Sequence, residues 1–456
     1  MKHVFRMMTA FIVLVLTFTA TIMSVEAVTT EDVEPYIEEY YFEDVNDAIF
    51  ENSVDDVFEE LDPYSTYYTA EEYEQFMSNI DQSFVGIGIS FELVEEGVFV
   101  RNVFEDSPAE EAGIKPGDII TYVDDVALEE KSSEEIASLI GGPEDTSVKI
   151  TLDRNGLIIT LDVTRQEIQV PIVTSQKLAG NIGYIQFQSF PQNLTELIQE
   201  HKQQLGDVDS WILDVRFNGG GYLQAAQQLL GMFPGIENSM IANYKNHQEV
   251  YKTIEQEETF NKPINLLINP YSASASEIFA AALKDYDKAT LYGETTFGKG
   301  RMQSLIQLPE EDGILKLTVA TFLSPLGNAI DEVGVNPDIE TKTPLADAHW
   351  NELNEKFDYQ VLNHLKDIAP DHQFTITLNR EADLESFEEK VKLATLGGEQ
   401  IDFDVKYLGE KQYQVTPTSP LQPGGEYAMY IQPGWTDQDR QRATSGVIVR
   451  ISVKSK

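Results

Sequence analysis

The sequence predicts a multidomain α/β protein in which an α/β core lies between two mostly β regions. The chain has 456 residues, and at roughly 100–200 residues per domain this length allows three or four domains. Apolar strands alternate with helical segments between residues 180 and 340, which is the pattern of βαβ units. Short alternating strands separated by Gly, Pro and Asp lie before and after that stretch. Because 42% of the residues are hydrophobic, several cores can form, and a largely disordered chain is excluded.

Residues 1–27 have the composition of a secretory signal peptide. Basic residues precede an apolar stretch of 17 residues from Met7 to Met23, and the small residues Val25 and Ala27 follow at the spacing of a cleavage site. An uncleaved membrane anchor is the alternative, because 17 residues is the lower limit for a span. We therefore expect export across the cytoplasmic membrane, to the cell surface or the extracellular space.

Residues 30–80 are predicted to form an N-terminal helical segment. Apolar side chains recur there at three- and four-residue spacing, and Pro63 separates two helical stretches. The second helix should begin near Thr69, because Thr69 and Glu72 have the spacing of a capping box. The segment is too short and acidic for a core of its own, so we expect it to pack on another domain or chain.

Residues 84–164 are predicted to form a small, mostly β module. Its first strand should be the run that begins at Phe84, in which two glycines let successive backbone N–H groups face a carboxylate while a peptide adds as a further strand. The candidate peptide-binding residues are Val85, Gly86, Ile87, Gly88 and Ile89. Val85, Ile87 and Ile89 would offer an apolar wall. The alternative is that the glycines only shape a turn.

The α/β core is predicted over residues 165–345, with any ligand site at the ends of its strands. The expected strands are 182–187, 211–215, 264–268 and 315–320, and the expected helices are 222–232 and 274–284. A helical linker is expected over residues 346–370. The alternation of apolar and polar residues between turns then predicts a β-sandwich over residues 371–456.

The charge and the missing cysteines exclude several classes of function. The chain has 77 Asp and Glu against 32 Lys and Arg, a net charge of −45, which argues against binding to nucleic acids or anionic membrane surfaces. It has no cysteine, which excludes disulfides, thiol nucleophiles and cysteine zinc sites. Since no cluster of metal ligands is visible in the sequence, we expect neither a metal nor a cofactor.

Ser274 lies at the predicted turn between a buried strand and an alanine-rich helix. A hydroxyl at this point can act as a nucleophile, because the N–H groups and the dipole at the start of the helix can stabilise an oxyanion. The alternative is a structural role, since Ser274 and Glu277 have the spacing of a capping box.

A nucleophilic serine needs a base, and Lys299 is the candidate. The six histidines lie in no recognisable acid–base motif, which leaves a Ser-His-Asp triad open but unsupported. Lys299 is flanked by glycines, and burial would lower its pKa from about 10.4 towards roughly 7. Gln303, four positions later, could hold the lysine nitrogen. The alternative is an ordinary glycine turn.

Three glycines, Gly219 to Gly221, follow the strand predicted over residues 211–215 and precede a helix. Such a turn can direct N–H groups at a developing oxyanion or at a phosphate. The phosphate interpretation is the weaker one, because the lysine and hydroxyl of a P-loop do not follow.

Together these segments resemble the C-terminal processing peptidases, also called tail-specific proteases, a Ser-Lys peptidase family. The resemblance covers about residues 30–345. It rests on the motifs Leu61–Tyr67, Asp214–Gly221, Ser272–Ile278, Asp285, Gly293–Gly300 and Gly334–Ile339.

The resemblance implies a serine endopeptidase with a PDZ domain over residues 84–164, inserted before a crotonase-like α/β peptidase core. By this resemblance Ser274 is the nucleophile, Lys299 the general base and Gln303 the residue that orients the base. The PDZ domain would recognise free, apolar C-terminal tails of protein or peptide substrates. Dimerisation through the N-terminal helices is a further expectation from the family.

The resemblance also assigns the remaining site residues. The N–H groups of Ala275 and of one glycine of the 219–221 turn would form the oxyanion hole, with Gly220 as the first candidate among the three, whereas the recurrent aspartate Asp285 suits a structural pairing. Two positions depart from the family pattern: Gly219, where many relatives have proline, and Met302, where the residue is often polar. Neither removes a reacting group.

Two alternatives to an enzyme remain. One is a non-catalytic PDZ-bearing binding or cell-surface interaction protein on the same fold. The other is a structural surface protein, suggested by residues 421–427, which resemble part of the Ig-like modules of bacterial surface proteins. In the enzyme, the predicted β-sandwich carries no candidate nucleophile or base and would serve attachment or spacing.

Overall fold

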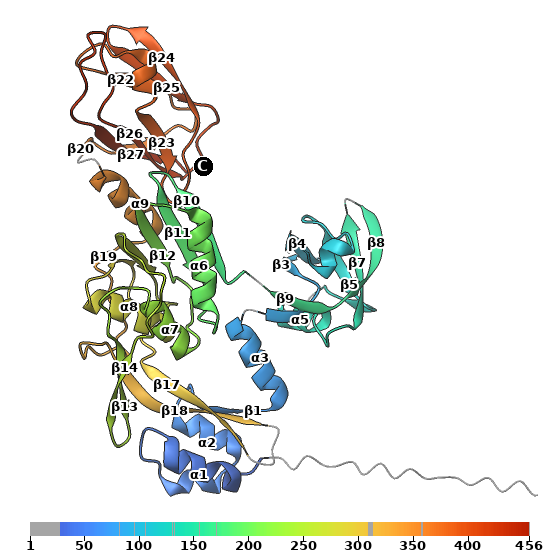
Figure 1. Cartoon of the computed structure of the whole chain (residues 1–456). Helices are drawn as coiled ribbons and strands as arrows, with labels where there is room; N and C mark the ends of the chain where they lie inside the picture. Colours follow the sequence, from blue (N-terminus) through green and yellow to red (C-terminus); the bar gives the residue numbers. More distant parts are fainter. Residues whose placement is uncertain are drawn as a thin grey trace, which may run out of the picture.

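The computed structural model describes residues 28–455, apart from 82, 95, 105, 130, 132, 155, 170, 309–312, 357 and 358. The predicted signal peptide lies outside the described residues. In the described part of the chain, no helix is long and apolar enough to cross a membrane. The N-terminal helices and the C-terminal sheets lie at opposite ends of the molecule, and the β module lies beside the α/β core (Figure 1).

The N-terminal unit packs on the core, as predicted. It comprises α1 (Thr30–Tyr40), η1 (Asp47–Glu51), α2 (Val54–Leu61), β1 (Thr66–Tyr68) and α3 (Ala70–Asp81). Buried side chains of α1 and α2 form one cluster with Leu315 and Leu317 of β18 (Ile314–Leu323), and β1 pairs with the same strand. Thr69 caps α3 as expected, since its N–H and hydroxyl both donate to Glu72 at 2.9 Å.

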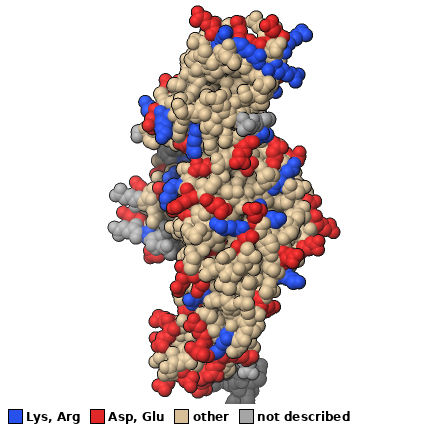
Figure 2. Space-filling model, turned by 90° about the vertical axis from the view of Figure 1, so that its left-hand side faces the viewer, with Lys and Arg blue, Asp and Glu red and all other residues tan. Residues whose placement is uncertain are grey.

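This end of the molecule is also its most acidic part. The sequence has no Lys or Arg between residues 7 and 100. Asp and Glu side chains are spread over the face seen in Figure 2 and gather at its lower end, where α1 and α2 lie.

The β module is built around a sheet of order β3-β4-β5-β7-β8, in which β6 pairs with β5. Its elements are β2 (Ser83–Gly86), β3 (Ile89–Val94), β4 (Gly97–Val103), α4 (Pro108–Glu111), β5 (Ile119–Val123), β6 (Val126–Ala127), α5 (Ser133–Ile140), β7 (Ser147–Arg154), β8 (Leu157–Thr164) and β9 (Gln166–Gln169). The single strand predicted from Phe84 is wrong, because β2 ends at Gly86 and pairs with β9, whereas β3 begins at Ile89. Gly88 allows the break, with φ of 82°.

The core sheet has the order β10-β11-β12-β15-β16-β19 and is parallel except for the β10–β11 pair. Its elements are β10 (Val173–Leu178), β11 (Ile182–Phe187), α6 (Leu194–Leu205), β12 (Ser210–Asp214), α7 (Leu223–Leu230), β15 (Ile264–Ile268), α8 (Ala275–Asp285), β16 (Thr290–Gly293), β19 (Ile339–Glu340) and α9 (Pro344–Glu355). The strands predicted over 182–187 and 264–268 are confirmed.

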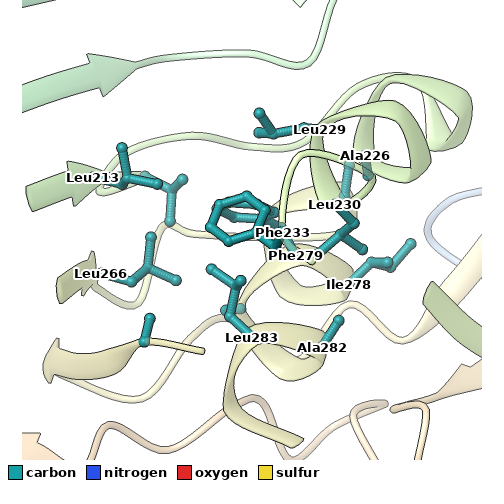
Figure 3. Close-up of a cluster of buried hydrophobic side chains, with 14 of the residues drawn as sticks. Leu213, Ala226, Leu229, Leu230, Phe233, Leu266, Ile278, Phe279, Ala282 and Leu283 are labelled. Atoms are coloured by element: carbon teal, nitrogen blue, oxygen red, sulfur yellow. The ribbon is translucent and has the colours of Figure 1, made fainter. Parts of the chain in front are cut away.

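Helices cover both faces of this sheet, which explains why its central strands β12 and β15 are buried along their whole length. Leu213 and Leu266 pack with Phe279 of α8 and with residues of α7 (Figure 3). The neighbouring residues Ile212 and Leu267 point to the other face and pack with residues of α9.

A second sheet carries the residues that approach the core from the N-terminal side. It contains β1, β13 (Asn238–Tyr244), β14 (Gln248–Lys252), β17 (Arg301–Gln307) and β18. β17 and β18 form a long antiparallel pair in which Leu305 lies opposite Lys316. The loop between β16 and β17 therefore connects the two sheets.

The helical linker predicted over residues 346–370 is wrong beyond Glu355, where α9 ends. The residues that follow instead form β20 (Gln360–Val361) and β21 (Leu365–Ile368), which pair in parallel with β27 (Val447–Val453). The free edge of β27 offers these residues backbone partners, and this outweighs their weak helical pattern.

The C-terminal unit consists of two sheets, β20-β27-β26-β23 with β21, and β22-β25-β24. Its remaining elements are β22 (Phe374–Thr377), α10 (Leu384–Glu388), β23 (Val391–Thr395), β24 (Phe403–Gly409), β25 (Gln412–Pro417) and β26 (Glu426–Ile431). Buried residues of both sheets form one cluster. A second cluster joins Tyr430 and Ile448 to Leu353 of α9 and Ile212 of the core sheet, so the unit shares apolar contacts with the core.

Candidate active site

A cavity of about 430 Å³ brings together the residues that the sequence singles out as catalytic. Its lining comes from α3, from the glycine turn after β12 and from the start of α8. The loop before β17 also contributes, as does strand β18. Ser274, Lys299, Gln303, Gly220 and Ala275 all line it. Segments that lie more than two hundred residues apart in the sequence, from Phe76 to Phe322, thus meet at one site.

Ser274 occupies the position just before α8, at the carboxyl end of β15. Its φ of 55° and ψ of −113° are unusual for a residue with a side chain, and such conformations cost about 1–3 kcal/mol. The strain places the side chain in the cavity at the helix N-terminus. The N–H of Ser274 donates to Glu277 at 2.9 Å, so the predicted capping partner is present without excluding a nucleophilic role.

Glu277 connects the serine to the loop that carries the lysine. Its side chain is fully buried and accepts four hydrogen bonds. The donors are the N–H groups of Ser274 (2.9 Å), Gly298 (2.6 Å) and Lys299 (2.8 Å) and the hydroxyl of Thr296 (2.6 Å). Burial raises the pKa of Glu277, while these hydrogen bonds oppose the rise. The capping-box pattern predicts only a capping role for Glu277, although a glutamate within an apolar helix is itself a sign of a further role.

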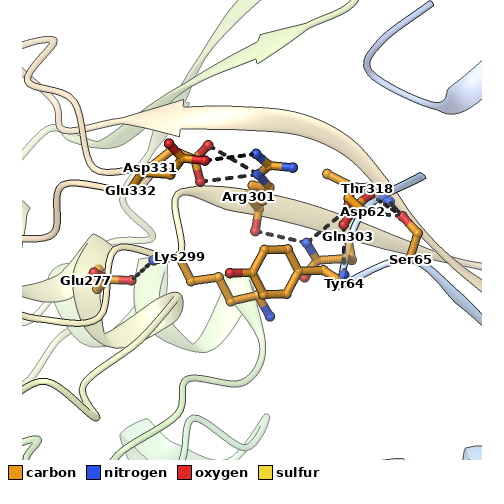
Figure 4. Close-up of polar contacts among 10 residues, drawn as sticks. All are labelled: Asp62, Tyr64, Ser65, Glu277, Lys299, Arg301, Gln303, Thr318, Asp331 and Glu332. Atoms are coloured by element: carbon orange, nitrogen blue, oxygen red, sulfur yellow. Dashed lines mark hydrogen bonds and ion pairs between the residues drawn. The ribbon is translucent and has the colours of Figure 1, made fainter. Parts of the chain in front are cut away.

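Lys299 has the properties of a base near neutral pH. Burial lowers its pKa to about 8, helped by the nearby charge of Lys316 and opposed by Glu277 and Asp62. Its ammonium nitrogen lies 4.9 Å from the centre of the Tyr64 ring, and Figure 4 shows the side chain extending alongside that ring. The direction of this pKa shift is the one expected from the sequence.

Gln303 lines the cavity, but the expected contact with Lys299 is not formed. Its amide nitrogen donates to the carbonyl oxygen of Arg301 at 3.2 Å and to the hydroxyl of Thr318 at 3.3 Å (Figure 4). Thr318 in turn donates to Asp62 at 3.1 Å. The amide of Gln303 is therefore held by its own strand pair and by the N-terminal unit.

Gly220 sits against the serine but does not present its N–H to the cavity as predicted. That N–H donates to the side chain of Asn218 at 2.9 Å, so it is already used. A Cβ on Gly220 would lie 2.9 Å from the Cβ of Ser274, which explains why only glycine fits there. Among the described residues, the N–H groups of Gly219 and Ala275 form no hydrogen bond, and both residues line the cavity.

The glycine turn is braced by buried polar side chains. Asp214 at the end of β12 accepts hydrogen bonds from Tyr184 at 2.8 Å and from the guanidinium of Arg216 at 2.6 Å. Asn218 is fully buried and donates to the carbonyl oxygen of Phe187 at 3.0 Å. These contacts fix the turn before any substrate binds.

Asp285 lies at the far end of α8 and has the structural role expected of it. Its carboxylate accepts the N–H of Leu326 at 2.8 Å and the side-chain amide of Asn328 at 3.0 Å, and so fixes the turn after β18.

The candidate peptide-binding residues of the β module form a braced loop rather than an exposed strand. Ile87 and Ile89 are 0% and 8% exposed in the core of the module, so the apolar wall predicted from them is wrong. The loop is held because Ile87 and Gly88 accept hydrogen bonds from the N–H groups of Ala109 and Phe104. Val85 is half-buried, and Gly86 ends β2. The edge strand next to this loop is β3.

Comparisons with known proteins agree with this geometry. The model of peptidase family S41 matches residues 181–341, and that of the PDZ domain matches residues 85–164. A probable CtpA-like serine protease of Staphylococcus epidermidis is 33% identical over 344 residues, which cover 74% of this chain and 66% of that protein. A protein of the same description from Staphylococcus aureus is 33% identical over 316 residues, which cover 67% of this chain and 62% of that protein.

Solved structures add one further similarity. The photosystem II D1 C-terminal processing protease is 24% identical, with a TM-score of 0.45 over 70% of this chain and 95% of that one. The family resemblance predicted from the sequence is confirmed by the sequence matches. The chain therefore belongs to peptidase family S41 and carries a PDZ domain.

Proposed function

We propose that this protein is an exported serine endopeptidase in which Ser274 is the nucleophile and neutral Lys299 is the general base. The observation that carries the proposal is the shared cavity: a strained serine at a helix N-terminus lines it together with a lysine whose pKa burial lowers to about 8. At pH 7 to 8 a substantial fraction of such a lysine is neutral and can accept a proton.

The reaction follows from these positions. The Ser274 oxygen attacks the scissile carbonyl while its proton passes to the Lys299 nitrogen, and the carbonyl oxygen becomes an oxyanion. The Lys299 ammonium then gives its proton to the leaving amine as the peptide bond breaks. Water, deprotonated by Lys299, hydrolyses the acyl-enzyme and restores Ser274.

The oxyanion is stabilised by N–H groups at the start of α8 and in the glycine turn. Ala275 retains the role expected from the sequence. Gly219 replaces Gly220 as the second donor, because the N–H of Gly220 is bonded to Asn218. Gln303 lines the same cavity as the base and acts in this proposal through its amide oxygen, since its amide nitrogen is bonded elsewhere.

The PDZ domain selects substrates by their free C-termini in this proposal. β3 is an edge strand, so a peptide can add to it through backbone hydrogen bonds. Because the chain has a net charge of −45, local N–H groups rather than the overall field must hold the terminal carboxylate.

The remaining sequence expectations also stay proposals. They are a crotonase-like core, an Ig-like C-terminal unit, a homodimer formed through the N-terminal helices, and a location at the cell surface or outside the cell. The contacts of Tyr430 and Ile448 with α9 and the core sheet favour a stabilising role for the C-terminal unit in addition to attachment or spacing.

Covalent labelling tests the proposed function. A serine-reactive fluorophosphonate should modify the wild-type protein at Ser274, and the Ser274→Ala variant should not react. Ser276→Ala is a matched control, because Ser276 lies two residues away but is buried and donates to Asn218. A folded wild-type protein that is not labelled would instead support a non-catalytic, PDZ-bearing binding protein.

A further inference from the structure

A second lysine, Lys316 of β18, lines the same cavity as Ser274 and Lys299. No sequence motif points to Lys316, because it lies within an apolar strand. Its ammonium nitrogen donates to the hydroxyl of Tyr68 at 2.8 Å and lies 5.1 Å and 5.0 Å from the ring centres of Tyr68 and Phe76. The centres of the two stacked rings lie 5.2 Å apart, so the rings form a fixed contact surface for the ammonium group. This surface of Tyr68 and Phe76 is called the seat of Lys316 below.

Burial lowers the pKa of Lys316, whereas Asp62 and this seat favour its charged form without neutralising it. Aromatic faces attract an ammonium group, and the Tyr68 hydroxyl accepts one of its hydrogens. Within 4.0 Å, no carboxylate of the described residues forms an ion pair with Lys316 or with Lys299. Lys299 has a single ring beside it, that of Tyr64. Of two like charges in one cavity, Lys299 is therefore the one that loses its proton more readily.

The other charged groups near Lys299 favour its protonated form. Glu277 of α8 and Asp62, which precedes β1, are both negative neighbours. Arg301 of β17 is paired with Asp331 and does not supply a free positive charge. The whole chain, at −45, also favours an ammonium group over a neutral amine. Burial alone has to overcome these charges, so a local positive charge adds to its effect in keeping a lysine base neutral in this protein.

We propose that Lys316 is a positioning residue that keeps Lys299 neutral by placing a fixed positive charge in the same cavity. The inference rests on the proposed role of Lys299 as the base. It also gives the N-terminal unit a part in catalysis, because β1 and α3 supply the seat that holds Lys316.

The test measures the titration of Lys299 directly. Competitive acetylation by acetic anhydride modifies only neutral amines, so the pH midpoint of Lys299 modification, followed by peptide mass spectrometry, reports its pKa. In Lys316→Met we expect this midpoint to rise by roughly 0.5–1 unit, the size of an interaction between like charges in a partly buried cavity. Fluorophosphonate labelling of Ser274 at pH 7 should then fall by about three- to tenfold and recover at higher pH.

Three further variants separate charge from structure. Lys316→Arg keeps the charge and should keep the wild-type midpoint, whereas Lys316→Gln should behave as Lys316→Met does and replaces it if that variant does not fold. Lys366→Met removes one positive charge from an exposed site on β21 and should change neither readout.

Two outcomes distinguish this inference from the proposed function. If Lys299→Ala is labelled at Ser274 as fast as the wild type, the proposed base is wrong. If Lys299→Ala abolishes labelling while folded Lys316→Met and Lys316→Gln leave the midpoint of Lys299 unchanged, the proposed base stands and the role of Lys316 is overturned.

Discussion

Replacing Glu277 by glutamine should loosen the connection between the serine and the lysine loop. The carboxylate accepts from Ser274 and Lys299 on one oxygen and from Gly298 on the other, but an amide has only one accepting atom. In its better orientation the amide oxygen keeps the bonds to Ser274 and Lys299, and the N–H of Gly298 is left unpaired at a cost of about 1–3 kcal/mol. The retained bonds also lose their charge-assisted strength. Removing a buried charge offsets part of this loss, so the free energy of unfolding should fall by about 2 kcal/mol.

Urea unfolding and the rate of fluorophosphonate labelling would measure these two consequences of Glu277→Gln. Labelling should slow by about tenfold or more, because small displacements of reacting groups are costly. Glu257→Gln removes the same charge from an exposed loop position and is the matched control. If Glu277→Gln unfolds at the wild-type urea concentration and is labelled at the wild-type rate, the connecting role of Glu277 is refuted.

Three other predictions concern stability and substrate choice. Burial lowers the pKa of His349 to about 4, and its ring is hydrogen-bonded to Gly397 and Ala179. The unfolded chain therefore binds a proton at this histidine more readily than the folded one. As the pH drops from 6.5 to 4, the free energy of unfolding of the wild type should fall by about 3 kcal/mol relative to that of His349→Gln. Urea titrations at several pH values would show this, and parallel curves for the two proteins would contradict it. Removing residues 371–456 exposes the apolar face shared with α9, so the melting temperature of the truncated chain should fall; an unchanged value would show that the C-terminal unit is independent. An unstructured peptide with an amidated, apolar C-terminus should be cleaved more slowly than its free-acid form, and equal rates would exclude tail recognition by the PDZ domain.

Local patterns in the sequence were sufficient for much of the fold and for the reacting groups. Mostly apolar runs identified β11 and β15, because strands covered on both faces need few polar positions. The Thr69 cap was predictable since its partner is three residues away. Ser274 and Lys299 could be selected as candidates because each lies in a short motif with its own chemistry.

Features that depend on distant partners could not be predicted in the same way. Lys316 and the Tyr68 hydroxyl are 248 residues apart, and no local pattern connects them. β20 and β21 are strands only because β27, about 85 residues later, offers them an edge. The direction of the Gly220 N–H was decided by the side chain of Asn218, which a glycine motif does not reveal.

The pH dependence of kcat/KM for peptide hydrolysis tests the Ser274–Lys299 mechanism most directly, in the wild type and in Lys299→Ala. Because burial lowers the pKa of Lys299 to about 8, the wild-type rate should rise with pH and level off above a midpoint near 8. Lys299→Ala, checked for folding, should lose several orders of magnitude in rate together with that rise. A folded Lys299→Ala variant with wild-type activity, or a wild-type profile with no rise between pH 7 and 9, would contradict a lysine base.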